Sequence, residues 1–243
     1  IESISWSRDG NKLALVGHTA SQSDIYVYDF TSKQLTNLTN DIYSDIDPTW
    51  LPDGSKVIYS SDRGNNLIQK VSNEQFEMNK FTFNQLDLYS IDIKTSAVDR
   101  LTDWEFSDEK FAAVANNGKE LVFVSDKNGV NNLYKMNFKD GKHDSKPVPI
   151  TNSLSEITQP SISADGKKLV FSALYNLGYN IFMLNDLPDM KVEGDSLRYT
   201  NYMGSVVAPK AERSDEKTVV ASKVEEKKIT PEVAADSTAK EEP

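Results

Sequence analysis

Short runs in which apolar and polar residues alternate follow one another through most of the chain. The clearest run, Lys56 to Ser61, comes directly after the pair Asp53-Gly54, and another short run, Pro48 to Leu51, precedes that pair. Glycine, and to a lesser degree aspartate, tolerates the positive φ angle that a tight hairpin turn requires. The pattern therefore predicts two antiparallel strands joined by a tight turn.

The same arrangement occurs at three other places, around Asp9-Gly10, Asn117-Gly118 and Asp165-Gly166. Self-similarity of this kind is typical of a tandem array of structural units. The third run of each unit carries an aromatic residue at an equivalent position, namely Tyr26, Tyr89, Tyr134 and Phe182.

Each unit offers four runs with the length and composition of strands. Runs rich in β-branched and aromatic residues, divided by Gly, Asp and Asn, predict an all-β protein. Four antiparallel strands repeated about every 40 to 50 residues predict the blades of a β-propeller. The runs cover residues 3–7, 12–16, 24–29 and 34–39, then 48–51, 56–61, 87–92 and 98–102, then 111–115, 120–125, 132–137 and 148–151, and finally 160–163, 168–173, 180–185 and a poorly defined fourth run.

The second unit carries the fullest form of the repeat. Asp45 to Gly54 reads Asp-x-x-Pro-x-Trp-x-Pro-Asp-Gly, and it is followed by Ser60-Ser61-Asp62-Arg63-Gly64, by Leu88 to Asp92 and by Leu101-Thr102. This pattern resembles the WD-like propeller repeat of the TolB and tricorn-protease families, and the resemblance extends over residues 1–186. The third unit departs from it, with Ala112 and Val114 in place of the Pro and Trp.

The resemblance implies a propeller segment over residues 1–204, with blades at about 1–40, 41–103, 104–152 and 153–204. Propellers of this family usually close with about six or seven blades. We therefore expect the four blades to belong to a larger ring, completed by further blades of the same polypeptide or by another chain. The resemblance also implies a periplasmic or otherwise extracytoplasmic location, although no targeting segment is visible in the sequence.

The final segment, Ser205 to Pro243, differs in composition from the rest of the chain. It contains no aromatic residue and consists largely of Lys, Glu, Ala, Val and Ser. Such a segment buries too little apolar surface to offset the entropy lost on ordering. We expect a disordered, charged linker or tail, with a charged helix over Glu212 to Lys228 as the alternative.

Composition also narrows the classes of function. The formal net charge of −10 argues against nucleic-acid binding, which needs a basic surface to displace counterions. The absence of cysteine from the sequence excludes disulfides, thiolate metal sites and cysteine nucleophiles. No apolar run reaches the about 18 residues of a membrane-spanning helix.

An insertion with apolar character separates the second and third strands of the second unit. The extra residues fall within Arg63 to Leu86. In a propeller, this connection emerges on the same face as the connections between successive blades, so we expect the insertion beside Asp41 to Asp47 and Asp103 to Glu109. It either folds over its own propeller or docks another protein or domain. Its aromatic residues are Phe76, Phe81 and Phe83.

The chain offers little for catalysis. Its two histidines, His18 and His143, fall in connections on opposite faces of the predicted blades and cannot share a site. No nucleophile elbow or histidine metal spacing occurs, and the acidic clusters match no calcium loop. We predict no catalytic residue, no metal and no cofactor. We expect the acidic clusters to form a solvated rim, and we interpret Asp45 as a turn residue of the repeat.

The face that carries the insertion would combine exposed aromatic side chains with an acidic surround. Such a surface suits a protein or peptide partner with basic residues and an apolar segment. The candidate binding residues are Phe76, Phe81, Phe83, Asp41, Asp45, Asp47, Asp103, Glu105 and Asp108.

Two function classes follow from the sequence. The first is a non-catalytic, TolB-like propeller that serves as a scaffold for binding a protein or peptide. The second is the substrate-gating propeller of a tricorn-type serine protease whose catalytic domain lies beyond Pro243. Fold alone does not separate them, because function resides in the loops added to a propeller.

Overall fold

The computed structural model describes residues 3–19, 22–67, 83, 85–115, 118–139, 142–143, 146–163, 165–190 and 196–208. The chain divides into two units, Ile1–Val207 and Ala208–Pro243, and the description below concerns the first. Phe76 and Phe81 of the insertion, and the predicted tail from residue 209 onward, lie outside the described residues.

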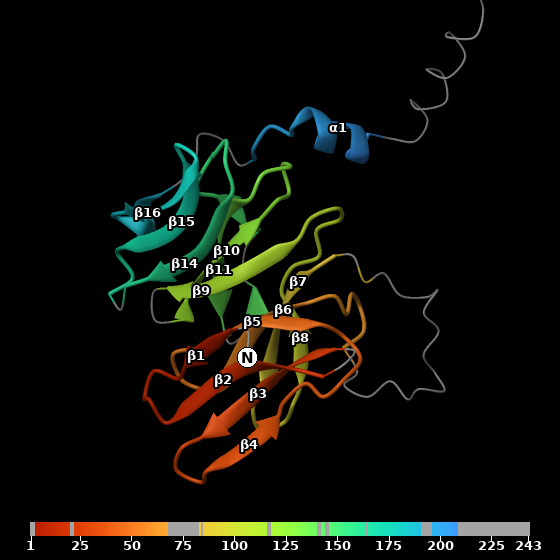
Figure 1. Cartoon of the computed structure of the whole chain (residues 1–243), viewed down its shortest axis with the longest axis vertical. Helices are drawn as coiled ribbons and strands as arrows, with labels where there is room; N and C mark the ends of the chain where they lie inside the picture. The colour runs from red at the N-terminus through yellow and green to blue at the C-terminus, as the bar shows by residue number, and fades with distance from the viewer. Residues whose placement is uncertain are drawn as a thin grey trace, which may run out of the picture. The chain divides into compact units, whose positions relative to one another are not determined.

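The first unit consists of antiparallel sheets, one for each predicted repeat, which confirms the all-β propeller architecture (Figure 1). Blade 1 contains β1 (Ile4–Trp6), β2 (Lys12–His18), β3 (Ser23–Asp29) and β4 (Gln34–Asn37). Blade 2 contains β5 (Asp45–Trp50), β6 (Lys56–Ser61), β7 (Asp87–Asp92) and β8 (Val98–Arg100). Blade 3 contains β9 (Glu109–Ala115), β10 (Glu120–Ser125), β11 (Asn132–Lys139), β12 (Lys142–His143) and β13 (Val148–Pro149). Blade 4 contains β14 (Ile157–Ile162), β15 (Leu169–Tyr175) and β16 (Gly178–Leu184).

The first hairpin of each blade turns at the glycine that the sequence marks. Gly10, Gly54 and Gly166 have φ angles of 73°, 70° and 71°, which side chains with a Cβ adopt only at a cost. In these three turns the glycine N–H donates a hydrogen bond to the carbonyl oxygen three residues earlier, of Ser7, Leu51 or Ser163.

A β-bulge recurs in the first strand of blades 2, 3 and 4. The pairing register shifts at Asp47, at Phe111 and at Gln159, and these residues have positive φ angles of 52°, 51° and 52°. Each lies seven residues before its turn glycine. The bulge is therefore a feature of the repeat, retained although none of the three residues is glycine.

The hydrophobic core lies between neighbouring blades. In β6, Val57 and Tyr59 pack in the cluster shared with blade 1, whereas Ile58 between them packs in the cluster shared with blade 3. A third cluster joins blade 3 to blade 4, with Val122 and Phe171 among its members. Successive residues of a strand point to opposite faces of its sheet, so alternate residues form the apolar contacts with the neighbouring blade on each side.

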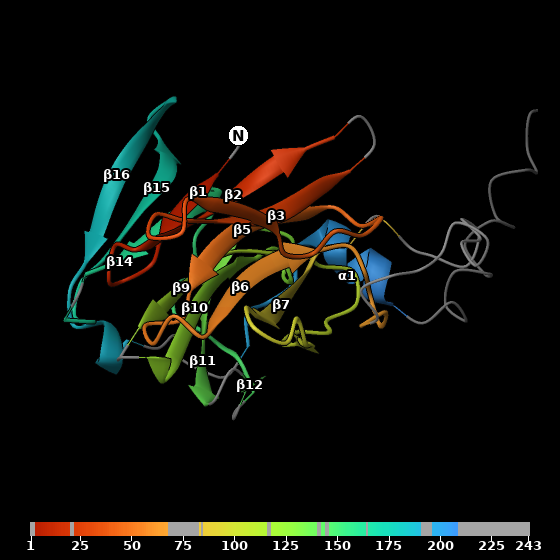
Figure 2. The same cartoon turned by 90° about the horizontal axis from the view of Figure 1, so that it is seen from below.

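The first strands of the four blades surround a central hollow of 300 Å³. In Figure 2, β1, β5, β9 and β14 lie around the middle of the array. Trp6 and Arg8 from blade 1 line the hollow together with Trp50 of blade 2 and Ile162 of blade 4. The hollow is the position of the central channel in a propeller.

Two short helices follow blade 4, η3 (Leu187–Asp189) and α1 (Asn201–Val207). Helix α1 includes Ser205 to Val207, which the sequence analysis assigns to the tail. Among the described residues, neither helix has the length and apolar character needed to cross a membrane.

Candidate functional site

The described end of the insertion packs against the β8–β9 connection (residues 101–108). The Leu86 N–H donates a hydrogen bond to Asp108 Oδ1 at 3.0 Å, and the Leu86 carbonyl accepts one from the Glu109 N–H at 2.7 Å. Gln85 Nε2 donates to the carbonyl of Trp104. The insertion and this acidic connection therefore meet, as the propeller register predicts.

The same end of the insertion also reaches the connection between blades 1 and 2. The ring of Phe83 lies against that of Tyr43, with 6.3 Å between the ring centroids. Tyr43 belongs to the connection that carries Asp41. Of the three aromatic candidates in the insertion, Phe83 is thus placed beside an acidic connection, whereas Phe76 and Phe81 lie outside the described residues.

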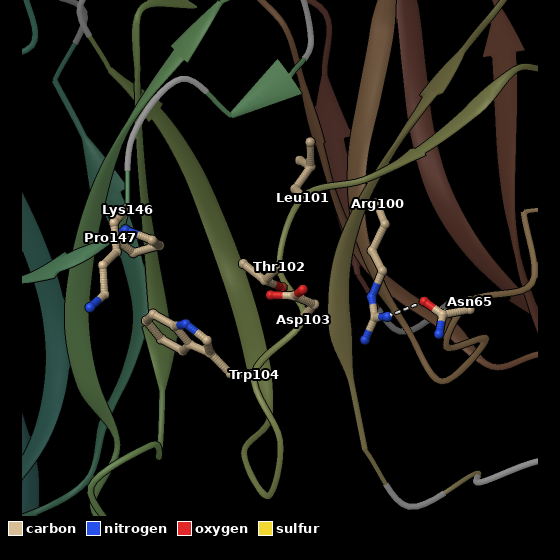
Figure 3. Close-up of a pocket in the computed structure, with 8 residues that line it drawn as sticks. All are labelled: Asn65, Arg100, Leu101, Thr102, Asp103, Trp104, Lys146 and Pro147. Carbon is tan, nitrogen blue, oxygen red and sulfur yellow. Dashed lines mark hydrogen bonds between the residues drawn. The ribbon is translucent and has the colours of Figure 1, made fainter.

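A pocket of 520 Å³ opens on one side of the β8–β9 connection, a volume typical of ligand sites. Figure 3 shows Trp104, Lys146 and Pro147 on one side of it and Arg100 with Asn65 on the other, with Asp103 between them. We call it the junction pocket. Its walls come from blades 2 and 3 and from the first residues of the insertion.

Aromatic packing fixes the wall of the junction pocket. The Trp104 ring meets Tyr134 edge to face at 5.1 Å, and Lys127 Nζ lies 3.5 Å from its centroid. Burial lowers the pKa of Lys127. Arg100 is anchored by Asp87, whose Oδ2 accepts a hydrogen bond from Arg100 Nη2 at 2.6 Å. The pocket therefore has firm walls that combine an indole face with charged groups of both signs.

A second hollow, of 430 Å³, lies on the other side of the connection. It combines apolar side chains with two carboxylates, and it reaches helix α1. Its lining residues are Gln85, Phe106, Ser107, Asp108, Asp126, Gly129, Tyr202, Met203 and Val206. We call it the α1 hollow.

Between these two hollows the β8–β9 connection presents its own side chains to solvent. Asp103 and Glu105 are exposed, and Phe106 is 53% exposed. Phe106 also has a φ angle of 62°, an uncommon conformation for a bulky residue. Asp108 is half-buried and pairs with Lys110 at 2.9 Å. The predicted acidic residues of this connection are thus accessible, with an exposed aromatic ring beside them.

The acidic residues between blades 1 and 2 differ from the expected solvated rim. Asp41 and Asp45 are buried, because both bind the guanidinium group of Arg63, which is 2% exposed. Arg63 Nη2 lies 3.0 Å from Asp41 Oδ2 and 2.8 Å from Asp45 Oδ1. Asp45 is also not a turn residue but the first residue of β5, paired with Ser61. Asp47 is half-buried within the same strand.

Three tyrosine rings surround the guanidinium of Arg63, at 5.2 to 5.5 Å from their centroids. Burial acting alone would lower the pKa of Arg63, but Asp45, Tyr59 and Asp41 together raise it. Burial, followed by the charge of Asp45, raises the pKa of Asp41 to about 7. Transferring a charged group from water to the protein interior is costly, so Arg63, Asp41 and Asp45 stabilise the fold only together.

Carboxylate oxygens of Asp24, Asp41 and Asp45 lie within 4.8 Å of one another, an arrangement that could hold a cation. Arg63 already supplies a positive charge to two of them. Asp24 accepts hydrogen bonds from Asn37 at 2.9 Å and from the Asp41 N–H at 3.2 Å. These contacts explain the cluster as the ion-pair centre that joins blades 1 and 2.

Glu109, like Asp41 and Asp45, does not lie on the solvated rim that the sequence predicts. It is the first residue of β9 and is fully buried. Its Oε1 accepts hydrogen bonds from Ser107 Oγ at 2.8 Å and Ser125 Oγ at 2.9 Å. Burial raises the pKa of Glu109 to about 8, and the charge of Asp87 acts in the same direction.

Sequence reasoning missed the aromatic and basic residues of the site. Trp104 and Phe106 alternate with the acidic residues Asp103 and Glu105, and this alternation was the available signal. Lys146 is far from them in the sequence, and only the pairing of β13 with β11 brings its segment to the junction pocket.

The fold defines the class of the protein as a β-propeller. Residues 2–87 match the family model described as the TolB beta propeller domain. The Tol-Pal system protein TolB of Francisella tularensis subsp. mediasiatica is 23% identical over 171 residues, covering 70% of this chain and 34% of that protein. The chain therefore spans about a third of the length of the curated relatives it matches.

Solved structures agree on the fold. TolB from Acinetobacter baumannii has a TM-score of 0.56 at 21% identity, over 76% of this chain and 40% of that chain. Puromycin hydrolase has a TM-score of 0.55 at 17% identity, over 82% of this chain and 29% of that chain. Because proteins with different names share this propeller, its function has to be argued from the site.

Proposed function

We propose that this chain is a non-catalytic, TolB-like propeller that binds a protein or peptide on the face formed by the β6–β7 and β8–β9 connections. The observation that carries the proposal is the position of the β8–β9 connection between the junction pocket and the α1 hollow. Aromatic side chains beside pockets are the usual anchors of protein interfaces. By resemblance to the periplasmic TolB propeller, an extracytoplasmic location is part of the proposal.

The expected partner is a segment with basic and apolar residues. Asp103 and Glu105 would attract its cations, and Phe106 would contact its apolar side chains. Phe83 and Asp108 remain members of the proposed surface. Asp41 and Asp45 form ion pairs with Arg63, so in this proposal they stabilise the neighbouring connection and do not contact the partner.

The test begins with random peptides displayed on phage, selected on the wild-type chain. Sequences that combine Lys or Arg with apolar residues should be enriched. With one such peptide, Phe106→Ala should weaken binding by roughly 1–3 kcal/mol. Glu105→Lys should mainly slow association, and less so at high salt, where surface charges are screened.

The exposed Leu154, which lines neither the junction pocket nor the α1 hollow, supplies the control variant Leu154→Ala, which should bind the peptide like the wild type. Selection without enrichment of basic and apolar sequences would contradict the proposal. So would binding that is insensitive to both site variants. Peptides that instead depend on Trp6 or Arg8 in the central hollow would favour the substrate-gating alternative.

A further inference from the structure

The α1 hollow combines exposed aromatic rings with carboxylate groups. Tyr202 and Phe106, which are 76% and 53% exposed, both line it. Asp108 and Asp126 line it as well, and both are half-buried. A hollow of 430 Å³ with apolar side chains and a few charged groups has the size and composition of a ligand site.

Helix α1 forms one wall of the hollow and is fixed to the β10–β11 connection (residues 126–131). The Thr200 N–H donates a hydrogen bond to the Asn128 carbonyl at 2.8 Å, and the Thr200 hydroxyl accepts one from the Met203 N–H at 3.2 Å. Met203 is 5% exposed and lines the hollow. Because Asp126 and Asn128 belong to the same connection, the carboxylate and the α1 wall are held together.

The structural role of Asp126 uses one of its two oxygens. Its Oδ1 accepts a hydrogen bond from the Asp108 N–H at 2.8 Å. Asp62 and Ser44, at the same repeat positions in blade 2, form the equivalent hydrogen bond at 2.9 Å. Within the described part of the chain, Oδ2 of Asp126 has no hydrogen-bond donor. One carboxylate oxygen beside the hollow is therefore available to a ligand.

The nearby basic residues are engaged elsewhere. Lys110 Nζ lies 2.9 Å from Oδ2 of Asp108, and Lys127 Nζ lies 3.5 Å from the centroid of the Trp104 ring. Among the described residues, Asp126 forms no ion pair, and none of those that line the hollow is basic. Burial raises the pKa of Asp126, and the charge of Asp108 acts in the same direction. The hollow therefore has an excess of negative charge that a cation would neutralise.

The chain itself shows which cation suits rings and carboxylates together. The Arg63 guanidinium lies 5.2 to 5.5 Å from the centroids of three tyrosine rings and pairs with Asp41 and Asp45. A planar guanidinium stacks on aromatic rings and donates several hydrogen bonds to carboxylates, whereas the ammonium of lysine is a strongly hydrated point charge. The combination of groups in the α1 hollow therefore favours arginine over lysine.

We propose that the α1 hollow binds an arginine side chain of the partner, with the guanidinium against Asp126 and the ring of Tyr202. The alkyl stem of this arginine would lie along Phe106 and Met203. The contact rests on the proposed function, because the hollow borders the β8–β9 connection, where the partner is expected to lie. Asp126 would thus be the residue that selects arginine within a basic partner segment.

A double-mutant cycle between the chain and a peptide from the phage selection tests this contact. Each arginine of the peptide is replaced in turn by citrulline, which keeps the shape of arginine without its charge. At one position, citrulline should weaken binding to the wild type roughly tenfold or more. On Asp126→Asn, the arginine and citrulline peptides should bind within about twofold of each other. Asparagine keeps an oxygen for the Asp108 N–H but removes the charge.

Asp53→Asn is the matched control, because it removes the same charge at the turn before β6, at the opposite end of that strand from the insertion. It should bind both peptides like the wild type. Tyr202→Ala, altered at an exposed position, should weaken the arginine peptide and leave the citrulline peptide nearly unchanged. Circular dichroism would verify that the variants remain folded.

Equal losses from citrulline on the wild type and on Asp126→Asn, at every arginine, overturn the proposed contact. So does a selection that enriches lysine but no arginine. If binding in these cases still responds to Glu105→Lys, only the arginine contact fails, and the proposed function of the face stands. A selection that yields no basic peptide contradicts both.

Discussion

The substitution Glu109→Gln would remove a buried carboxyl group while preserving its shape. Burial moves the pKa of this group from 4.5 to about 8 in the folded chain. Between these two values the folded protein holds a proton that the unfolded chain has released. Stability must therefore fall as pH rises through this window, and the loss is complete above about pH 8.

The size of the effect follows from the same shift. A tenfold change in a proton-binding constant is worth about 1.4 kcal/mol. The full displacement of the pKa then corresponds to roughly 5 kcal/mol, of which roughly 3 kcal/mol is lost by pH 7. In the variant, the amide oxygen can still accept the hydrogen bonds of Ser107 and Ser125. Glu109→Gln should therefore resemble the wild type near pH 4.5 and be more stable above pH 8.

Urea unfolding followed by tryptophan fluorescence at a series of pH values measures this difference. Glu105→Gln, which changes the same charge at an exposed position of the neighbouring connection, is the matched control. Its stability should differ from that of the wild type by a small amount at every pH. If the difference between wild type and Glu109→Gln stays constant from about pH 5 to about pH 9, Glu109 titrates normally in the fold and the reasoning is wrong.

Arg63→Ala should lower the free energy of unfolding by roughly 3–5 kcal/mol in the same urea assay, because it leaves two buried carboxylates without their cation; a loss below about 1 kcal/mol would show that the ion pairs contribute little. Gln159→Gly should raise stability by roughly 0.5–1 kcal/mol, since this exposed residue has a φ angle of 52°, and an unchanged or lower urea midpoint would contradict that estimate. Gly129→Ala should lower the melting temperature, because its Cβ would lie 2.1 Å from Thr200 Oγ1. Gly10→Ala, with a similar positive φ but open space around it, separates backbone strain from this clash, and equal losses in the two variants would exclude the clash.

Much of the fold could be predicted because its information is local. The Asp-Gly turns and the alternating runs beside them place strands such as β6, β7 and β10 at their observed bounds. The register of the repeat also places Gln85 and Leu86 beside the β8–β9 connection, as observed. The bulges at Asp47, Phe111 and Gln159 escape such reasoning, because none of these residues is glycine, the residue that adopts the left-handed conformation without strain.

The candidate site was predicted only in part. Asp103 and Glu105 are exposed as expected, whereas Asp41, Asp45 and Glu109 are buried. Aspartate and glutamate in a connection normally face water, and an acidic cluster alone gives no reason to expect otherwise. The groups that allow these carboxylates to be buried come from segments that meet only in the folded protein.

By itself, the sequence determined the repeat, the strand period and the faces that each strand offers, since turn chemistry and alternation act over a few residues. Only the tertiary structure decided which charged residues leave water. Asp45 is buried because folding brings the guanidinium of Arg63 to it from another strand end, and Glu109 because the hydroxyls of Ser107 and Ser125 close over it. A charge can be buried only where partners converge, and that convergence depends on how the blades pack.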